Sequence, residues 1–285
     1  MVVLKKVKTF AELVKFEHTI FALPFAYLGA FLGKWGWPGW YEFIWITLAM
    51  FGARSSAMGF NRVIDRFIDA ANPRTNGRPL PQGKMKSSEV VILSILAFGL
   101  LVWATYKLSP WHVIYLPIIL AILVGYSYTK RFTWACHLVL GIAISFAPLG
   151  GWIAVTGEMS KPAFLLAGIV ACWIAGFDII YATQDYDFDK KTGLHSIPVR
   201  FGLEKGLLIS QGLHLVVIIL LVILYLYLPL GRLFLVGISV TAILLIYEHS
   251  LVSAHDLSKV NVAFFNINGV ISILLFIFTL LDIYL

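Results

Sequence analysis

The sequence has few charged residues and almost no cysteine. Only 13% of its 285 residues are charged, and its two cysteines are Cys136 and Cys172. Soluble domains carry about 25% charged residues, so this composition excludes an ordinary soluble protein. The cysteines form no paired motif, which indicates core thiols, and zinc is disfavoured because His and Cys are not clustered. No small-residue cleavage site follows a short apolar core, so we expect no signal peptide.

The residues that are abundant are those of a membrane protein. Hydrophobic residues make up 60% of the chain, the mean hydropathy is +0.87, and nine tryptophans are present. Apolar runs of about 20 residues are long enough to cross the hydrocarbon, and tryptophan is enriched at membrane interfaces. We therefore predict an all-α, polytopic protein with one domain over 1–285. Its nine predicted transmembrane helices lie at about 16–33, 41–60, 89–108, 111–129, 134–155, 162–183, 205–228, 232–251 and 262–283.

The basic residues are unevenly distributed between the predicted links. The N-terminus and the links after the second, fourth, sixth and eighth spans carry 17 lysines and arginines, whereas the opposite links carry four. Because cytoplasmic links are rich in Lys and Arg, we place the former in the cytoplasm, in the cell (inner) membrane. This distribution also explains the net charge of +7 without a nucleic-acid partner.

The first acidic motif lies directly after the second predicted span. Asn61, Asp65 and Asp69 recur every four residues, so on a helix they form a stripe of oxygen ligands, the first acidic stripe. Pro73 and the pair Asn76-Gly77 predict that this helix ends in a turn. The first motif loop covers about 61–88.

Basic residues follow that turn, and a second acidic motif lies after the sixth span, in a loop at about 184–204. Arg74 and Arg78 are well placed to meet an anion, and Asp185 and Asp189, the second acidic pair, are again four residues apart. Carboxylates beside basic groups suit Mg²⁺, which prefers hard oxygen ligands and shares substrate phosphates. The alternative is ordinary solvated charge at helix ends, which two such motifs make less favourable.

The sequence resembles the UbiA family of intramembrane aromatic prenyltransferases, most closely its 4-hydroxybenzoate polyprenyltransferase branch. The matching segments are NRVIDRFID (61–69), RTNGRPLPQG (74–83), YSYTKRFT (126–133) and DIIYATQDYDFD (178–189). The resemblance implies helices around a lipid-open central cavity. It also implies magnesium-dependent transfer of a polyprenyl group from an allylic polyprenyl diphosphate to an aromatic acid in quinone biosynthesis.

The resemblance further implies roles for individual residues. The first acidic stripe and the second acidic pair would hold magnesium and the diphosphate, while Arg74, Arg78 and Lys130 would bind its phosphates. The family motif usually reads NDxxDxxxD, and Arg62 stands at its second position. Arginine cannot ligate a metal, so Arg62 is expected either to contact the phosphate or to extend toward lipid headgroups.

Two charged residues fall inside predicted spans. Arg54 precedes Asn61 by seven residues, and Asp178 precedes Asp185 by seven, which places both at a similar depth, about 10 Å from the motif ends. A charge inside the bilayer costs about 2.5–3.5 kcal/mol and usually pairs or faces a cavity. Two hypotheses follow: the residues bind the aromatic acid, or they form a structural ion pair between spans two and six.

Several polar residues are weaker candidates for the same cavity. They are Tyr126, Ser145, Tyr181 and Lys15, although a basic residue that flanks a first span, such as Lys15, is more often an orientation signal. His195 is typical of a solvated loop, and His214 and Gln211 are expected to bond between helices. The remaining acidic and His residues near one link, Glu248, His249, His255 and Asp256, have no convincing metal-site spacing.

The same sequence features admit two alternative functions. A transporter would bind its substrate at the midplane in broken helices, whereas these motifs lie at one face and the spans are not visibly interrupted. Within the enzymes, prenylation of a naphthoate-type acid in menaquinone biosynthesis fits the same motifs.

The charge distribution predicts the topology. A cysteine introduced at Lys84 should be labelled from the cytoplasmic side and one at Lys161 from the other side, in a background that lacks Cys136 and Cys172. Accessibility labelling with a membrane-impermeant thiol reagent measures this. Equal labelling of both positions from one side would contradict the nine-span arrangement.

Overall fold

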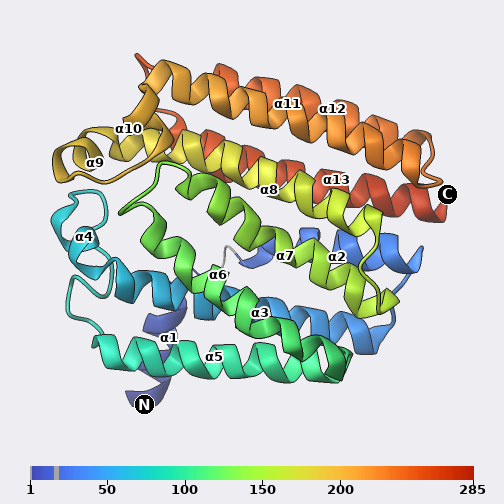
Figure 1. Ribbon diagram of the computed structural model, residues 1–285, viewed down its shortest axis with the longest axis horizontal. Helices are drawn as coiled ribbons and strands as arrows, with labels where there is room; N and C mark the ends of the chain where they lie inside the picture. Colours follow the sequence, from blue (N-terminus) through green and yellow to red (C-terminus); the bar gives the residue numbers. More distant parts are fainter. Residues whose placement is uncertain (1, 16–18) are drawn as a thin grey trace. The chain divides into compact units, whose positions relative to one another are not determined.

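The computed structural model describes residues 2–15 and 19–285, which form helices and turns with no β-strand among them. The all-α prediction is therefore confirmed for these residues (Figure 1). The longer helices are α1 (Val2–Leu13), α2 (Thr19–Lys34), α3 (Trp40–Ile64), α5 (Ser87–Leu108), α6 (Leu116–Thr129), α7 (Cys136–Thr156), α8 (Lys161–Ala182), α11 (Leu203–Tyr227), α12 (Arg232–Ser250) and α13 (Asn268–Tyr284). The shorter ones are α4 (Arg66–Ala71), η2 (Pro110–Tyr115), η3 (Thr183–Asp185), α9 (Tyr186–Thr192), α10 (Ile197–Phe201) and η4 (Val262–Ile267).

The predicted spans agree with the observed helices. Eight segments of the described chain are long and apolar enough to cross a membrane, and they correspond to the second to ninth predicted spans. The first predicted span corresponds to α2, although residues 16–18 of that prediction lie outside the described residues. The chain is therefore an integral membrane protein with close to the predicted number of spans.

The helices group into two compact units, which are described separately below. Unit 1 contains Met1–Leu23 and Trp40–Tyr128, and unit 2 contains Pro24–Gly39 and Thr129–Leu285. The expectation of one domain over 1–285 stays a prediction.

Unit 1 is built on the antiparallel helices α3 and α5. Gly52 of α3 lies against the backbone of Ala97 and Leu101, and Gly59 lies against Ser94. Small residues at a helix contact let two backbones approach closely, and such contacts drive helix association where lipid removes the hydrophobic driving force. The long α3–α5 contact thereby fixes the end of α3, which carries the first acidic stripe.

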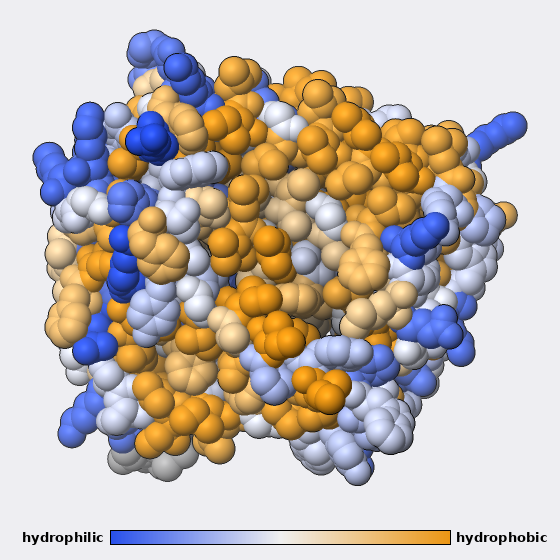
Figure 2. Space-filling model, viewed as in Figure 1, coloured by the Kyte–Doolittle hydropathy of each residue, from blue (hydrophilic) through white to orange (hydrophobic). Residues whose placement is uncertain are grey.

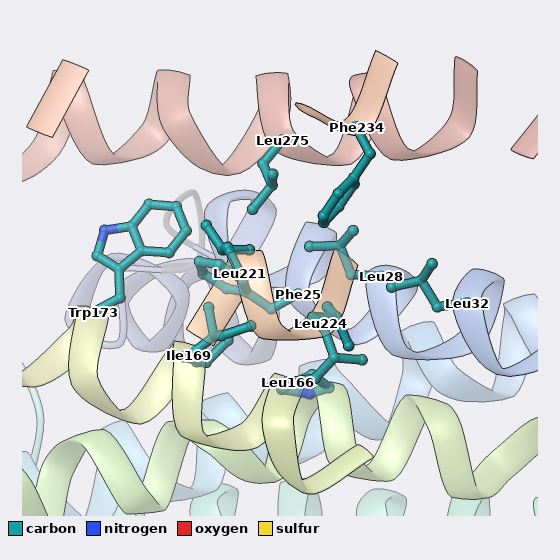
Figure 3. Close-up of a pocket in the computed structure, with 12 residues that line it drawn as sticks. Phe25, Leu28, Leu32, Leu166, Ile169, Trp173, Leu221, Leu224, Phe234 and Leu275 are labelled. Carbon is teal, nitrogen blue, oxygen red and sulfur yellow. The ribbon is translucent and has the colours of Figure 1, made fainter. Parts of the chain in front are cut away.

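Unit 2 has a dense apolar core shared by several helices. Trp173 of α8, Leu221 and Leu224 of α11, Phe234 of α12 and Ile271 of α13 are all 1% exposed or less. The side chains around this core leave a small cavity lined only by apolar residues, several of which point into it in Figure 3. Its free volume is about 10 Å³, close to the least that one water molecule needs. This cavity is a packing gap and not a substrate site.

The outer surface of unit 2 is suited to lipid. Leu208, Leu215 and Leu226 of α11 are 65%, 61% and 76% exposed. Figure 2 shows hydrophobic residues over most of α11, with hydrophilic residues gathered at the end near α10. Such a continuous apolar face is unusual for a protein in water and fits contact with acyl chains.

Buried polar groups link four helices of unit 2. Trp173 Nε1 donates to Asn268 Oδ1 at 2.6 Å, and Asn268 Nδ2 donates to Glu248 Oε1 at 2.8 Å. His214 of α11 and His249 of α12 share a hydrogen bond of 2.9 Å, which confirms the predicted interhelical role of His214. Gln211 is exposed on the same helix as His214, and its predicted bond between helices stays a prediction.

The remaining residues of the predicted polar group separate in the structure. His255 and Asp256 are exposed, whereas Glu248 is fully buried. In the part of the chain that the structure describes, no three His, Cys, Asp or Glu side chains converge on a point that would hold a metal ion.

Unit 2 also shows why two glycines four residues apart occur in α2. A Cβ at Gly29 would fall on the carbonyl oxygen of Pro148 in α7, and one at Gly33 would lie 2.9 Å from Val155 Cγ2. Gly151 of α7 meets the backbone of Ala26 in the same way. The Gly29-x-x-x-Gly33 spacing therefore marks a close helix contact in this protein.

This contact predicts a difference between two glycine substitutions. Gly29→Ala should destabilise the protein by about 1–3 kcal/mol, because the added methyl group overlaps the α7 backbone. Gly150→Ala is the matched control, because a Cβ there meets nothing within 4 Å, and it should stay within about 0.5 kcal/mol of the parent. Thermal unfolding in one detergent measures both. Equal midpoint temperatures of thermal unfolding for the two variants would contradict the close contact between α2 and α7.

Candidate active site

The first acidic stripe lies where α3 passes into α4. The backbone amide of Asp65 donates to Asn61 O at 2.9 Å, and that of Asp69 donates to Asp65 O at 2.8 Å. These two helical hydrogen bonds continue across the junction, so the three side chains keep the predicted spacing of one turn. Asp65 and Asp69 are each 4% exposed. The sequence pattern thus becomes a row of oxygen-bearing side chains in which both carboxylates are buried.

The chain turns back after α4 and returns a basic residue to the stripe. Asn72 Oδ1 accepts the amide of Arg74 at 2.9 Å, and Thr75 Oγ1 donates to Asp69 O at 3.0 Å. Arg78 Nη1 then donates to Asp69 Oδ1 at 2.7 Å. The predicted turn is confirmed. It allows Arg78 to form an ion pair with the buried carboxylate of Asp69.

Arg62 is a second cation at the same carboxylate. Its Nη1 lies 3.9 Å from Asp69 Oδ2 and donates to Asn61 Oδ1 at 3.3 Å. Its Nε donates to Leu13 O at 3.4 Å. Arg62 is only 9% exposed, so the expectation that it extends toward lipid headgroups is wrong. The physical reason is that the stripe and the end of α1 together satisfy its charge inside the protein.

A serine that the sequence interpretation missed completes the contacts of Asn61. The amide Nδ2 of Asn61 donates to Asp65 Oδ2 at 3.0 Å and to Ser127 Oγ on α6 at 3.1 Å. Ser127 is 3% exposed and follows Tyr126 directly. Its signal was present in the segment YSYTKRFT, in which Tyr126 and Lys130 were the residues singled out.

The second acidic pair belongs to unit 2. Asp185 ends η3 and Asp189 lies in α9, both half-buried. Gly193 ends α9 with a φ of 73°, and the amide of Leu194 donates to Asp189 O at 2.9 Å. The pair is therefore carried on helical backbone, as the four-residue spacing predicted. The segment 184–204, which we expected to be a loop, is helical over most of its length.

Asp178 has a partner that the sequence did not reveal. Asp178 Oδ2 lies 2.7 Å from Nδ1 of His137 in α7, and His137 Nε2 accepts the amide of Ile197 at 3.3 Å. His137 is 3% exposed. The two residues are 41 positions apart, so no local pattern signals the pair. Arg54, the expected partner of Asp178, is half-buried on α3 of unit 1, and that pairing stays a prediction.

The other candidate residues have varied surroundings. Arg74 and Lys15 are exposed, and Lys15 has a positive φ of 54° just after α1. Lys130 accepts the amide of His195 at its carbonyl oxygen at 2.7 Å, and the His195 side chain is exposed. Ser145 is 7% exposed and donates to Ile142 O of its own helix at 2.8 Å.

Tyr181 packs against the π-helical segment η4. Its ring stacks on Phe264 with a centroid distance of 4.1 Å. Phe264 also meets Phe177, one turn earlier on α8, at 5.1 Å. Tyr181 is therefore part of an aromatic group that joins α8 to η4.

The arrangement in unit 1 has a definite chemistry. Buried carboxylate oxygens lie beside two guanidinium groups, and guanidinium matches carboxylate and phosphate in charge and shape. Asp69 Oδ2 is buried and accepts no hydrogen bond, so it retains lone pairs for a further cation. The site can therefore bind a phosphate-bearing ligand together with a hard metal ion.

Comparison with known proteins agrees with this reading. The model of the UbiA prenyltransferase family matches residues 22–270. The chain is 32% identical over 276 residues to a 4-hydroxybenzoate octaprenyltransferase of Vibrio campbellii, which covers 93% of this chain and 94% of that protein.

Solved structures show the same fold. The apo structure of a UbiA homolog from Aeropyrum pernix K1 is 31% identical, with a TM-score of 0.85 over 93% of this chain and 98% of that one. A UbiA homolog from Archaeoglobus fulgidus, whose structure was solved bound to GPP and Mg²⁺, is 19% identical with a TM-score of 0.77 over 97% and 100%. The chain therefore belongs to the UbiA prenyltransferase family and is a membrane-embedded prenyltransferase.

Proposed function

We propose that the protein transfers a polyprenyl group from an allylic polyprenyl diphosphate to an aromatic acid, 4-hydroxybenzoate, in quinone biosynthesis, with Mg²⁺ as cofactor. The observation that carries this proposal is the buried Asp69 carboxylate held beside Arg62 and Arg78 at the end of α3. The relative named 4-hydroxybenzoate octaprenyltransferase supports the acceptor. The Archaeoglobus fulgidus structure with GPP and Mg²⁺ supports the donor and the ion.

The residues present fit a magnesium ion. Their donor atoms are hard oxygens, and Asp69 Oδ2 is a buried oxygen without a hydrogen-bond donor. The side chains that would hold the ion are those of the first acidic stripe and the second acidic pair, namely Asn61, Asp65, Asp69, Asp185 and Asp189. When bound, the ion supplies positive charge that stabilises the departing diphosphate.

Basic side chains of the chain itself bind the phosphate oxygens. Arg78 is positioned by its bond to Asp69, and Arg74, Lys130 and Lys15 supply further positive charge in this proposal. These groups favour the transition state because the negative charge of the diphosphate grows as its carbon–oxygen bond breaks. Apolar helices keep water from the allylic cation. A ring carbon of the acceptor then forms the new carbon–carbon bond and releases its proton.

The acceptor is proposed to bind through Arg54 and Asp178, with Tyr126 and Ser145 beside it. The guanidinium of Arg54 binds the carboxylate of the acid through two parallel hydrogen bonds. Asp178 is held by His137 at 2.7 Å, so its remaining oxygen has a fixed direction. That oxygen accepts the hydrogen bond of the ring hydroxyl, which raises electron density on the ring.

The membrane placement is part of the same proposal. The motif segments face the cytoplasm from the cell (inner) membrane, as the distribution of Lys and Arg predicts. A naphthoate-type acid is the alternative acceptor, and it is an outcome of the assay below.

Purified protein should convert 4-hydroxybenzoate and a polyprenyl diphosphate to the prenylated acid in the presence of Mg²⁺, and lose this activity with EDTA. Product is measured by chromatography for a panel of aromatic acids and isoprenoid diphosphates. In the same assay, Asp65→Asn and Asp185→Asn should each lower turnover by at least about a hundredfold, since each removes a carboxylate proposed to hold the ion that stabilises the leaving diphosphate.

A matched control comes from the second motif. Asp187 lies between Asp185 and Asp189 but is exposed and off the four-residue spacing. Asp187→Asn should therefore keep nearly full activity. Retained magnesium-dependent activity in Asp65→Asn or Asp185→Asn would refute the assignment of that carboxylate, and preferred use of a naphthoate-type acid would replace the proposed acceptor.

Arg54 predicts a kinetic distinction between the two substrates. Arg54→Lys should raise the KM for the aromatic acid about tenfold or more and leave the KM for the diphosphate nearly unchanged, because lysine cannot form the paired bonds. Steady-state kinetics with each substrate varied in turn measures this. A higher KM for the diphosphate alone would place Arg54 at the phosphates, and lower thermal stability with both constants unchanged would assign it a structural role.

A further inference from the structure

Arg62 is a cation built into the first acidic stripe, at a position where its guanidinium cannot itself ligate a metal ion. We propose that Arg62 is a positioning residue that keeps the stripe charge-balanced, so that a divalent ion binds firmly only together with the substrate diphosphate. This inference rests on the proposed function, because it concerns how the proposed ion and the proposed substrate depend on each other for binding.

Three contacts hold the Arg62 guanidinium in place. Nε donates to the carbonyl oxygen of Leu13 at 3.4 Å, Nη1 donates to Asn61 Oδ1 at 3.3 Å, and the same nitrogen lies 3.9 Å from Asp69 Oδ2. The side chain is 10% exposed and that of Asp69 is 5% exposed. Solvent screens buried charges little. The positive charge of Arg62 therefore acts on any metal ion that approaches the stripe.

The N-terminal helix provides a contact for Arg62 that lies outside the stripe. Leu13 is the last residue of α1, and the carbonyl groups at a helix C-terminus carry partial negative charge that attracts a cation. Leu13 and Val14 are each 2% exposed and pack with Leu80 and Met85 of the first motif segment. The end of α1 therefore anchors the guanidinium and limits how far it moves when a phosphate arrives.

Arg62 lies beside the oxygens that a metal ion would use. Asn61 Oδ1 already accepts its hydrogen bond, and Asp69 is held between it and Arg78, whose Nη1 binds Asp69 Oδ1 at 2.7 Å. Asp65 and Asp69 together carry two negative charges, which the two guanidinium groups balance. A divalent ion alone gains little at such a site.

The size of this effect follows from the geometry. An ion bound to Asp69 Oδ2 at about 2.1 Å would lie within about 6 Å of Arg62 Nη1. At about 6 Å, even the dielectric constant of water gives roughly a tenfold weaker affinity for a divalent ion beside one positive charge. A less polar surrounding makes the repulsion larger.

The diphosphate reverses this balance. It brings several negative charges that attract both the ion and the two arginines, so the ion and the diphosphate should each strengthen binding of the other by the same factor. Mg²⁺ commonly completes its coordination with phosphates and water.

The test measures binding of Mn²⁺, a paramagnetic substitute for Mg²⁺, to the purified full-length protein. Binding is followed as the loss of the electron paramagnetic resonance signal of free Mn²⁺. Without diphosphate, Arg62→Gln should bind Mn²⁺ at least about tenfold more tightly than the parent. Arg62→Lys keeps the charge and should resemble the parent. Arg66→Gln is the matched control, because Arg66 contacts Val63 O and the Phe67 ring instead of the stripe, and it should also resemble the parent.

The parent protein gives a second measurement that does not depend on a variant folding. Mn²⁺ alone should bind weakly, and inorganic pyrophosphate should increase its uptake by protein at least about tenfold. Tight binding of Mn²⁺ without pyrophosphate, or equal Kd values for Arg62→Gln and the parent, would overturn the inference. Loss of turnover with EDTA tests the proposed function separately, so either idea can fail while the other stands.

Discussion

The structure of unit 1 depends on the compensation of negative charge that the fold buries. Asp65 and Asp69 are each 4% exposed, and a buried carboxylate is strongly unfavourable unless a cation and hydrogen bonds accompany it. Asp69 meets this requirement with Arg78 from the following turn and Arg62 from the preceding helix. The path of the chain after α4, including the bond from Thr75 to Asp69 O, serves to return Arg78 to this position.

In unit 2 the acidic side chains are also compensated by partners, but these partners are a histidine and an asparagine instead of arginines. Asp178 is paired with His137, and Glu248 is bonded to Asn268 inside an apolar core. These pairs join α7 to α8 and α12 to α13 at points where lipid offers no alternative partner. A glycine contact also brings α7 close to α8, because Gly141 lies against the backbone of Ala171. The helices of unit 2 are thus held together both by close backbone contacts and by polar pairs.

Much of this was predictable because membrane insertion imposes strong local rules. Apolar runs identified the spans from α3 to α13 to within about a turn, since a helix must satisfy its own backbone in lipid. The spacing of Asn61, Asp65 and Asp69 predicted a stripe because helix geometry repeats nearly every four residues. Arg62 shows the limit of such reasoning. Its side chain reaches Leu13, 49 positions away, and no local pattern distinguishes that contact from extension toward lipid.

The sequence by itself determined the class of protein, its helices and the chemistry of its motifs, because hydrophobicity, helical periodicity and oxygen or guanidinium groups are properties of local residues. The segments 61–69, 74–83, 126–133 and 178–189 together indicated the family to which the comparisons assign the chain. Only the tertiary structure decided which partner each polar side chain takes: Arg78 for Asp69, His137 for Asp178 and Ser127 for Asn61. The physical reason is that these partners are brought together by helix packing, and packing depends on the shape of the whole core.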